Sequence, residues 1–210
     1  MVPLIILVPA YNELSNLKKI LKKNKKLFFI IDDCSDDNTQ NFLINNKISY
    51  IRNKKNLGYE ESLLKGMKFI IKNYKKKKFI CTIDGDNEHP AKMINKIISF
   101  FLKKNYDILI CNRKIKNRFL EKCLSFLFKK KYQIKDPMSG MKFYKIYSLK
   151  KIINFSSNNF FLVDLIYLAI KNKFKIGNYE IRTKRNLRNS KIGFGFQTQL
   201  KILKTFKFLI

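Results

Sequence analysis

At 210 residues the chain is long enough for one substantial domain and short for two, and its 46% hydrophobic content suffices for a core. Its 45 basic residues face only 15 acidic ones, a formal net charge of +30, and such a surface attracts nucleic acid, anionic lipid or phosphorylated substrates. Only six of the basic residues are Arg, the side chain preferred for reading bases and binding phosphates, so we favour a general lysine bias over a surface built to bind such polyanions.

The first half of the chain alternates short apolar segments with helix-like ones. Strands are expected at 4–8, where Pro9 ends the run, and at 27–32, 48–51, 79–83 and 107–111. Helices are expected between them, at about 14–24, 37–45, 59–73 and 91–103. This alternation predicts βαβ units, and therefore an α/β fold with a largely parallel sheet and helices on both faces.

The second half is less regular. Residues 119–131 read as a basic amphipathic helix, followed by a turn at 136–140, an apolar helix at about 160–171 and a strand at 176–182. A basic loop at 183–192 leads to residues 198–210, where lysines alternate with apolar residues at the spacing of a second basic amphipathic helix.

Polar clusters follow three of the expected strands. The first strand leads into residues 9–13, the second into 32–37 and the fourth into Asp84-Gly85-Asp86. Ligands of open parallel sheets bind beyond the carboxyl ends of the strands, so these clusters should converge on one crevice. Converging carboxylates repel one another unless a cation joins them, and hard oxygen ligands beside a phosphate suit Mg²⁺ or Mn²⁺. A D-x-D pair alone is common, and its position at a strand end favours a metal site.

Three segments together resemble the family-2 inverting glycosyltransferases: V-P-A-Y-N-E at 8–13, I-D-D-C-S-D-D-N-T at 31–39 and I-D-G-D-N-E-H-P at 83–90. Gly58 and Gly66 lie where that family has its N-x-G…G segment. Within the family the chain is most similar to the dolichyl- or polyprenyl-phosphate sugar (mannose or glucose) synthases, through D-G-D-N-E-H-P, I-K-D-P-M-S-G-M-K at 134–142, and Arg185 with Ser190-Lys191.

The resemblance covers residues 2 to about 192 and implies a GT-A-like fold, related to the Rossmann fold, with a mostly parallel central sheet. It implies one glycosyltransferase domain over 1–210. Residues 1–112 would be its nucleotide-binding half, and 113–210 an acceptor-side half with the basic amphipathic helices.

The resemblance also implies roles for individual residues. The nucleotide-binding positions are Pro9, Tyr11, Glu13, Asp33 and Asp84. A tyrosine ring against a base and a carboxylate accepting its N–H suit that role. Asp86 matches the direct metal ligand, supported by Asp84, and Glu88 takes the place of a Gln that often serves as the second ligand in the synthases. The catalytic set is Asp86, Arg113 and Asp84, with Arg113 pointing at the sugar phosphate.

The acceptor or diphosphate positions implied by the resemblance are Arg118, Arg185, Lys191 and Asp164. Asp164 is either a base or a buried helix carboxylate paired with a cation, and we favour the second. His89, the one histidine of the chain, is expected to be structural. The sequence departs from the family in a shorter loop between Arg113 and Arg118, and in Arg188-Asn189 where a glycine usually precedes the S-K pair.

The implied function is a metal-dependent, inverting transfer of a sugar from a GDP- or UDP-sugar to a polyprenyl-phosphate acceptor. A phosphate acceptor is already an anion and needs no strong base, so positioning and charge stabilisation would carry the reaction. The alternative is a sugar-hydroxyl acceptor in surface polysaccharide synthesis, which requires a base, with Asp164 the best candidate. A non-catalytic binding module and a basic nucleic-acid-binding module are rivals, and only a transferase site predicts metal-dependent binding of nucleoside diphosphates.

No signal peptide or membrane span is expected, because no segment approaches the roughly 20 apolar residues that a span requires. The cysteines show no C-x-x-C spacing and fit reduced thiols in a cytoplasmic protein. The basic helices at 119–131 and 198–210 could rest on the anionic inner face of a membrane, which fits a lipid-linked acceptor, although lysine bias would produce the same pattern.

Overall fold

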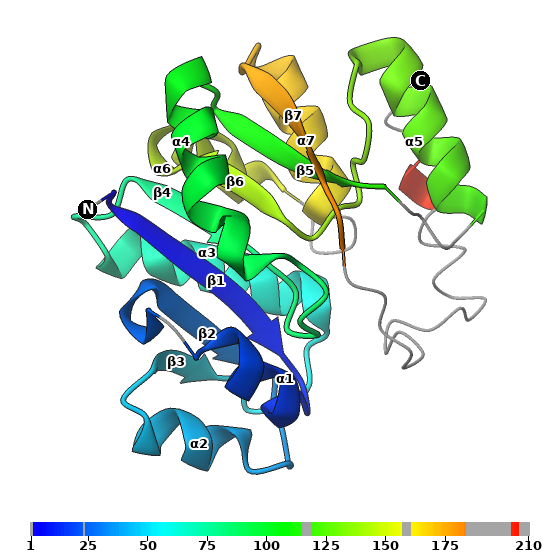
Figure 1. Cartoon of the computed structure of the whole chain (residues 1–210). Coiled ribbons are helices and arrows are strands. Elements are labelled where there is room, and N and C mark those ends of the chain that lie inside the picture. Colours follow the sequence, from blue (N-terminus) through cyan, green and yellow to red (C-terminus); the bar gives the residue numbers. More distant parts are fainter. Residues whose placement is uncertain (1, 23, 115–118, 157–160, 184–202, 206–210) are drawn as a thin grey trace.

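Seven strands form one sheet in the order β3-β2-β1-β4-β6-β5-β7 (Figure 1). The computed structural model describes residues 2–22, 24–114, 119–156, 161–183 and 203–205. The strands are β1 Leu4–Ala10, β2 Phe28–Asp32, β3 Ser49–Arg52, β4 Phe79–Thr82, β5 Ile108–Arg113, β6 Lys142–Lys145 and β7 Ile176–Ile181. Every pairing is parallel except those of β6, which runs antiparallel to both β4 and β5. The expected α/β fold with a mostly parallel sheet is confirmed.

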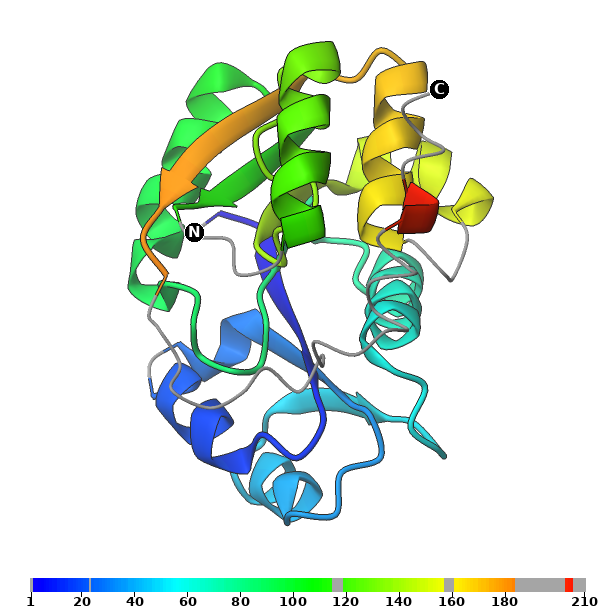
Figure 2. The ribbon, with the colours of Figure 1, turned by 90° about the vertical axis from the view of Figure 1, so that its right-hand side faces the viewer.

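Helices cover both faces of the sheet (Figures 1 and 2). They are α1 Leu14–Ile20, α2 Thr39–Asn45, α3 Tyr59–Asn73, α4 Ile94–Lys104, α5 Phe119–Tyr132, α6 Ile146–Ile152 and α7 Phe161–Lys171. All seven residues of β1 are buried, and alternate side chains enter opposite layers. Ile5 and Leu7 pack with α3, α5, α6 and α7. Leu4, Ile6 and Val8 pack with α1, α2 and α4.

Helix α3 lies close against β1 and β2. Its buried residues Leu63, Met67 and Ile70 recur at the helical period, and Gly58, with φ of 84°, precedes its first turn. At Gly66 a Cβ would lie 2.7 Å from side-chain atoms of Leu7 and Ile31. The helix therefore needs glycine here in order to approach the sheet, and this approach fixes where its N-terminus meets the strand ends.

The expectation that Pro9 ends the first strand is wrong, because β1 continues to Ala10 and Pro9 pairs with Ile31 of β2. Residues 7 and 9 turn their main-chain polar groups to the same side, toward β4, and the pairing with β4 extends only to Leu7. The missing N–H of Pro9 therefore breaks no ladder hydrogen bond.

Other boundaries differ from the expected ones. Helix α1 ends at Ile20 rather than near residue 24, and a 3-10 turn, Ala91–Met93, precedes α4. Strand β6 and helix α6 were not predicted at all. The expected helix at 198–210 and the basic loop at 183–192 lie almost entirely outside the described residues. Within the described residues, no helix is both long and apolar enough to cross a membrane.

Candidate active site

Asp84 is held from three sides at the carboxyl end of β4. The Tyr59 hydroxyl, at the start of α3, donates a hydrogen bond to Asp84 Oδ1 at 2.6 Å. His89 Nδ1 accepts the main-chain N–H of Asp84 at 3.3 Å and lies 3.6 Å from its Oδ2. Gly140 lies against the same carboxylate, where a Cβ would overlap it. The carboxylate is therefore oriented by contacts from α3, the loop after β4 and the turn before β6.

Asp86 lies in a strongly negative environment. Burial, followed by the charges of Asp84, Glu88 and Glu13, raises its pKa from 3.8 to about 7, although the Glu88 N–H donates to it at 2.9 Å. Glu13 comes from the end of β1, which confirms that the polar clusters after β1 and β4 meet. The chain also passes close to β1 at Gly85, where a Cβ would lie 2.9 Å from the Pro9 carbonyl oxygen. Mutual repulsion of this kind is what a bound cation relieves.

Asp84, Asp86 and His89 can each offer a ligand atom within 4.8 Å of the others. Two carboxylate oxygens suit Mg²⁺ or Mn²⁺, and imidazole is a common third donor for transition metals. His89 is 4% exposed, and burial lowers its pKa, so the ring is neutral. Its Nδ1 accepts the Asp84 N–H, so Nε2 carries the proton, and Nε2 has no hydrogen-bond partner within the described part of the chain. The ring must release the Asp84 N–H before Nδ1 can bind a metal, whereas the two carboxylates fit a divalent cation as they stand. Glu88 is not in this group, and its role as a ligand stays a prediction.

Arg113 is the last residue of β5 and forms an ion pair with the buried carboxylate of Asp136. Its Nε and Nη2 donate to Asp136 Oδ2 and Oδ1 at 2.9 and 3.1 Å, and Glu121 of α5 lies 3.8 Å away. Burial alone would lower the pKa of Arg113, but the hydrogen bonds and charge of Asp136 outweigh it and raise the pKa. Asp136 is 0% exposed, so this bidentate pair fixes the guanidinium at the strand end.

Lys142, on β6, is a fully buried cation that sequence reasoning did not single out. Its Nζ donates to the Ser139 carbonyl, and burial lowers its pKa to about 8 against the opposing charges of Asp136 and Asp84. The one signal in the sequence was its place in the I-K-D-P-M-S-G-M-K segment. Tyr59 was also missed, and nothing in its local pattern distinguished it from a core aromatic.

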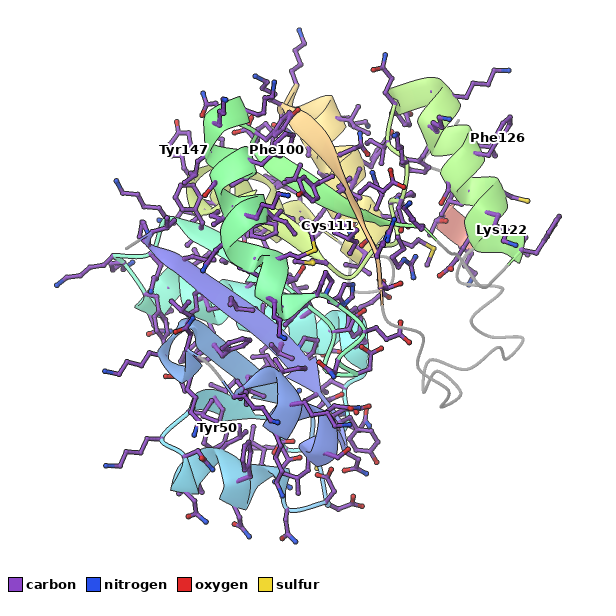
Figure 3. The ribbon with its side chains drawn as sticks, in the orientation of Figure 1. Tyr50, Phe100, Cys111, Lys122, Phe126 and Tyr147 are labelled. Carbon is purple, nitrogen blue, oxygen red and sulfur yellow. The ribbon has the colours of Figure 1, made fainter. Side chains whose placement is uncertain are left out.

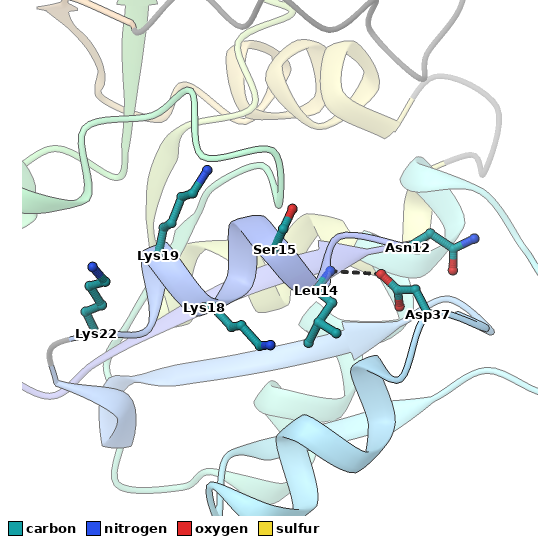
Figure 4. Close-up of a pocket in the computed structure, with 7 residues that line it drawn as sticks. All are labelled: Asn12, Leu14, Ser15, Lys18, Lys19, Lys22 and Asp37. Carbon is teal, nitrogen blue, oxygen red and sulfur yellow. Dashed lines mark hydrogen bonds between the residues drawn. The ribbon is translucent and has the colours of Figure 1, made fainter.

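The expected nucleotide-side residues gather at the ends of β1 and β2. Tyr11 is 40% exposed, whereas Asp33 is 3% exposed and accepts the N–H groups of Leu57 and Gly58, both at 2.8 Å. The Asp33 carboxylate therefore holds the turn that begins α3. Beside them lies a hollow of about 480 Å³ (Figure 4). It is lined by Asn12, Leu14, Ser15, Lys18, Lys19, Lys22 and Asp37.

A sequence profile of the family described as glycosyl transferase family 2 matches residues 5–153, which include every strand-end cluster described above. The chain belongs to this family. It is a family-2 glycosyltransferase by descent.

Relatives of this glycosyltransferase include two uncharacterized proteins of Methanocaldococcus jannaschii. One is 36% identical over 134 residues, which are 60% of this chain and 58% of that protein, so the match spans little more than half of the relative. The other is 28% identical over 94% of this chain and 88% of its own length. Glucosyl-3-phosphoglycerate synthase of Mycobacterium tuberculosis, solved with Mn²⁺, UDP-glucose and phosphoglyceric acid, superposes with a TM-score of 0.75. Its 12% identity, over 98% of this chain and 79% of that one, shows the shared GT-A-like fold.

The remaining acceptor-side residues of the glycosyltransferase are less well placed. Asp164 lies in the first turn of α7 and is 6% exposed, which matches the expected buried helix carboxylate. Arg118, Arg185 and Lys191 lie outside the described residues. The structure therefore brings together Glu13, Asp84, Asp86 and Arg113, and leaves the basic acceptor positions as predictions.

Proposed function

We propose that this glycosyltransferase moves a sugar, with inversion and with the help of Mg²⁺ or Mn²⁺, from a GDP- or UDP-sugar to a polyprenyl-phosphate acceptor. The observation that carries the proposal is the group formed by Asp84, Asp86 and His89 at the end of β4. It lies close enough to Arg113 for the charge of Asp84 to raise the pKa of that guanidinium. Opposed charges after β4 and at the end of β5 suit a substrate that carries a diphosphate.

On the donor side, Pro9, Tyr11, Glu13 and Asp33 would contact the base and ribose. Asp84 would face the ribose and diphosphate, and Asp86 would be the main metal ligand, with Glu88 in support. A bound divalent cation would neutralise charge on the departing nucleoside diphosphate. Mn²⁺ or Mg²⁺ accompanies UDP in solved structures of the mycobacterial synthase, which supports the same arrangement here. This donor site would occupy residues 1–112.

On the acceptor side, a lipid phosphate attacks as an anion, so the protein needs to position it rather than deprotonate it. Arg113 supplies positive charge at the end of β5, and Arg118, Arg185 and Lys191 would complete the phosphate-binding set within residues 113–210. Attack from the face opposite the nucleotide inverts the anomeric centre. The similarity of D-G-D-N-E-H-P and I-K-D-P-M-S-G-M-K to the polyprenyl-phosphate sugar synthases supports this acceptor.

A hydroxyl acceptor is the second candidate, because it needs a base and Asp164 is a carboxylate in the first turn of α7 with only 6% of its surface exposed. A soluble phosphorylated acceptor, as used by the mycobacterial synthase, would instead need only the cationic set.

The test is donor turnover by the purified chain with Mn²⁺ or Mg²⁺, a panel of UDP- and GDP-sugars, and either a short-chain polyprenyl phosphate, phosphoglycerate or no acceptor. Asp86→Asn removes one site carboxylate. Glu180→Gln removes an edge-strand carboxylate whose side chain is 60% exposed, and serves as the matched control.

Metal-dependent release of nucleoside diphosphate that rises with the lipid phosphate, is lost in Asp86→Asn and persists in Glu180→Gln is the expected result. Stimulation by phosphoglycerate alone, or release without stimulation by either phosphate, would overturn the lipid-phosphate acceptor. Absence of both release and nucleotide binding with every donor would overturn the transferase assignment to this site.

A further inference from the structure

Helix α5 exposes two phenylalanines on its outward face. Phe119 is 76% exposed and Phe126 67% exposed. Lys122 and Lys130 are exposed at the intervening and following positions, so the four residues recur at offsets that place them on one face of a helix. Single exposed apolar side chains are ordinary on protein surfaces, whereas here two large rings alternate with lysines along one helix face.

The charge of this outward face is entirely positive. The one acidic residue of α5, Glu121, is 4% exposed and turned inward toward Arg113. Leu124 and Phe128 are fully buried on the same inward side. The exposed side chains of the helix thus combine aromatic rings with lysine ammonium groups, the composition of a helix that lies in the headgroup region of an anionic bilayer.

The helix that carries this outward face contacts the candidate active site with its inward side. Helix α5 follows β5, and Glu121 approaches the guanidinium of Arg113, which binds Asp136. Figure 3 shows Lys122 and Phe126 directed away from the body of the molecule, on the side where β5 ends. A surface in contact with the outward face would therefore be separated from Arg113, at the end of β5, by this one helix.

We propose that the outward face of α5, formed by Phe119, Lys122, Phe126 and Lys130, binds the surface of a bilayer that contains anionic phospholipid. The two rings enter the headgroup region and the lysines lie over lipid phosphates. A second copy of this chain is a poorer occupant, because two faces whose only charges are lysines repel one another. The link to catalysis rests on the proposed lipid-phosphate acceptor, but the binding surface itself does not.

The chain contains no tryptophan, so one introduced residue reports on one position. Phe126→Trp places the probe on α5, and Tyr147→Trp places a matched probe on α6, where Tyr147 is 71% exposed with Lys151 4.4 Å from its ring. In Figure 3 Tyr147 and Phe126 lie on opposite sides of the molecule. Each variant is mixed with vesicles of phosphatidylcholine alone, and with vesicles in which about a third of the lipid is phosphatidylglycerol.

We expect the emission of Phe126→Trp to shift to shorter wavelength with phosphatidylglycerol vesicles only, and that of Tyr147→Trp to stay unchanged. In flotation assays, Phe119→Ser with Phe126→Ser should lower the partition coefficient by about tenfold or more for loss of the rings. The paired change Tyr147→Ser with Phe155→Ser, both exposed aromatics elsewhere, should leave it within about twofold. Equal losses in the two pairs, or unchanged binding without the α5 rings, would overturn the proposal.

Two further results would also overturn it. If the chain self-associates without vesicles and this depends on Phe119 and Phe126, the face is a contact between copies of the chain. If the emission of Phe126→Trp does not shift with either kind of vesicle, the face does not bind lipid. Turnover of a short-chain prenyl phosphate in detergent-free solution tests the enzymatic proposal separately. Turnover without vesicle binding removes only the α5 inference, and vesicle binding without turnover removes only the lipid-phosphate acceptor.

Discussion

The hydroxyl of Tyr59 donates to Asp84 Oδ1 at 2.6 Å, and so joins the start of α3 to the end of β4. Burial, together with the charge of Asp84 and the hydrogen bond to it, raises the pKa of Tyr59 well above its usual value of 10, so the hydroxyl keeps the proton that it donates to Asp84. Helix α3 is itself placed by the close contact of Gly66 with β1 and β2. The orientation of the Asp84 carboxylate therefore depends on how α3 packs against β1 and β2.

Replacing Tyr59 with Phe tests this link. The ring still fills its place, but Asp84 loses one donor, so we expect unfolding stability to fall by only about 1 kcal/mol. The affinity for Mn²⁺ should weaken about tenfold, because the free carboxylate must be reoriented at each binding event. Titration of Mn²⁺ by calorimetry measures the effect, with Tyr50→Phe on β3 as the control. Equal metal affinity in the two variants would show that the hydrogen bond does not position Asp84.

Replacing Gly140 with Ala should disable the same carboxylate by crowding, since the new Cβ would overlap it. We expect metal affinity and donor turnover to fall together. Gly177→Ala on β7 is the matched control, because its Cβ would crowd only the ring of Tyr106. Overpacking typically costs about 1–3 kcal/mol, so both variants should melt earlier, but only Gly140→Ala should lose metal affinity at a temperature where both are folded. A common loss of metal affinity would contradict this.

The pair formed by Arg113 and Asp136 should be costly to break from one side. Asp136→Asn leaves a mostly buried guanidinium without its counter-ion, which typically costs about 3–5 kcal/mol. The double change Arg113→Met with Asp136→Leu removes both charges and should recover most of that stability, but not turnover. Denaturant unfolding and nucleotide release separate the two effects. Recovered turnover in the double variant would show that Arg113 acts only in folding.

Local features of the sequence predicted the strands that position the site. The elements that long-range packing determines were not predictable from the sequence. The five apolar runs of the first half became β1 to β5 because each is short, apolar and followed by turn residues. Strand β6 could not be predicted because K-F-Y-K is short and carries lysine at both ends. It also pairs antiparallel with β4 and β5, which are distant from it in sequence. Nothing local to residues 142–145 indicates that pairing.

The same distinction holds for the site. Asp84 and Asp86 were predictable because they follow a strand directly. The contacts of Tyr59, His89 and Gly140 with Asp84 depend on how α3 and the turn before β6 pack against β4, and that packing is set by the core as a whole. His89 was expected to be structural, and its place within 4.8 Å of both carboxylates makes it a candidate ligand as well.

Asp86 gives the site a pH dependence of defined sign. Its pKa in the folded chain is raised from 3.8 to about 7, so between these values the folded chain holds a proton that the unfolded chain has lost. Without metal, stability should therefore fall as the pH rises from about 4 to about 7, and level off above. Below about pH 7 a metal ion must displace this proton, so its apparent affinity should rise up to about tenfold per pH unit and then become constant.

Calorimetric titration of Mn²⁺ at about pH 6 and about pH 8, with the full chain in matched ionic strength, measures this dependence. Asp86→Asn removes the titrating carboxylate and is the control: its residual affinity should be weak and nearly independent of pH over that range. A second variant tests what raises the pKa of Asp86. Glu88→Gln removes one of the neighbouring negative charges that raise the pKa of Asp86, so the pH at which affinity becomes constant should move down. If that pH stays the same while the affinity drops strongly, Glu88 is a direct ligand whose charge contributes little to the pKa of Asp86.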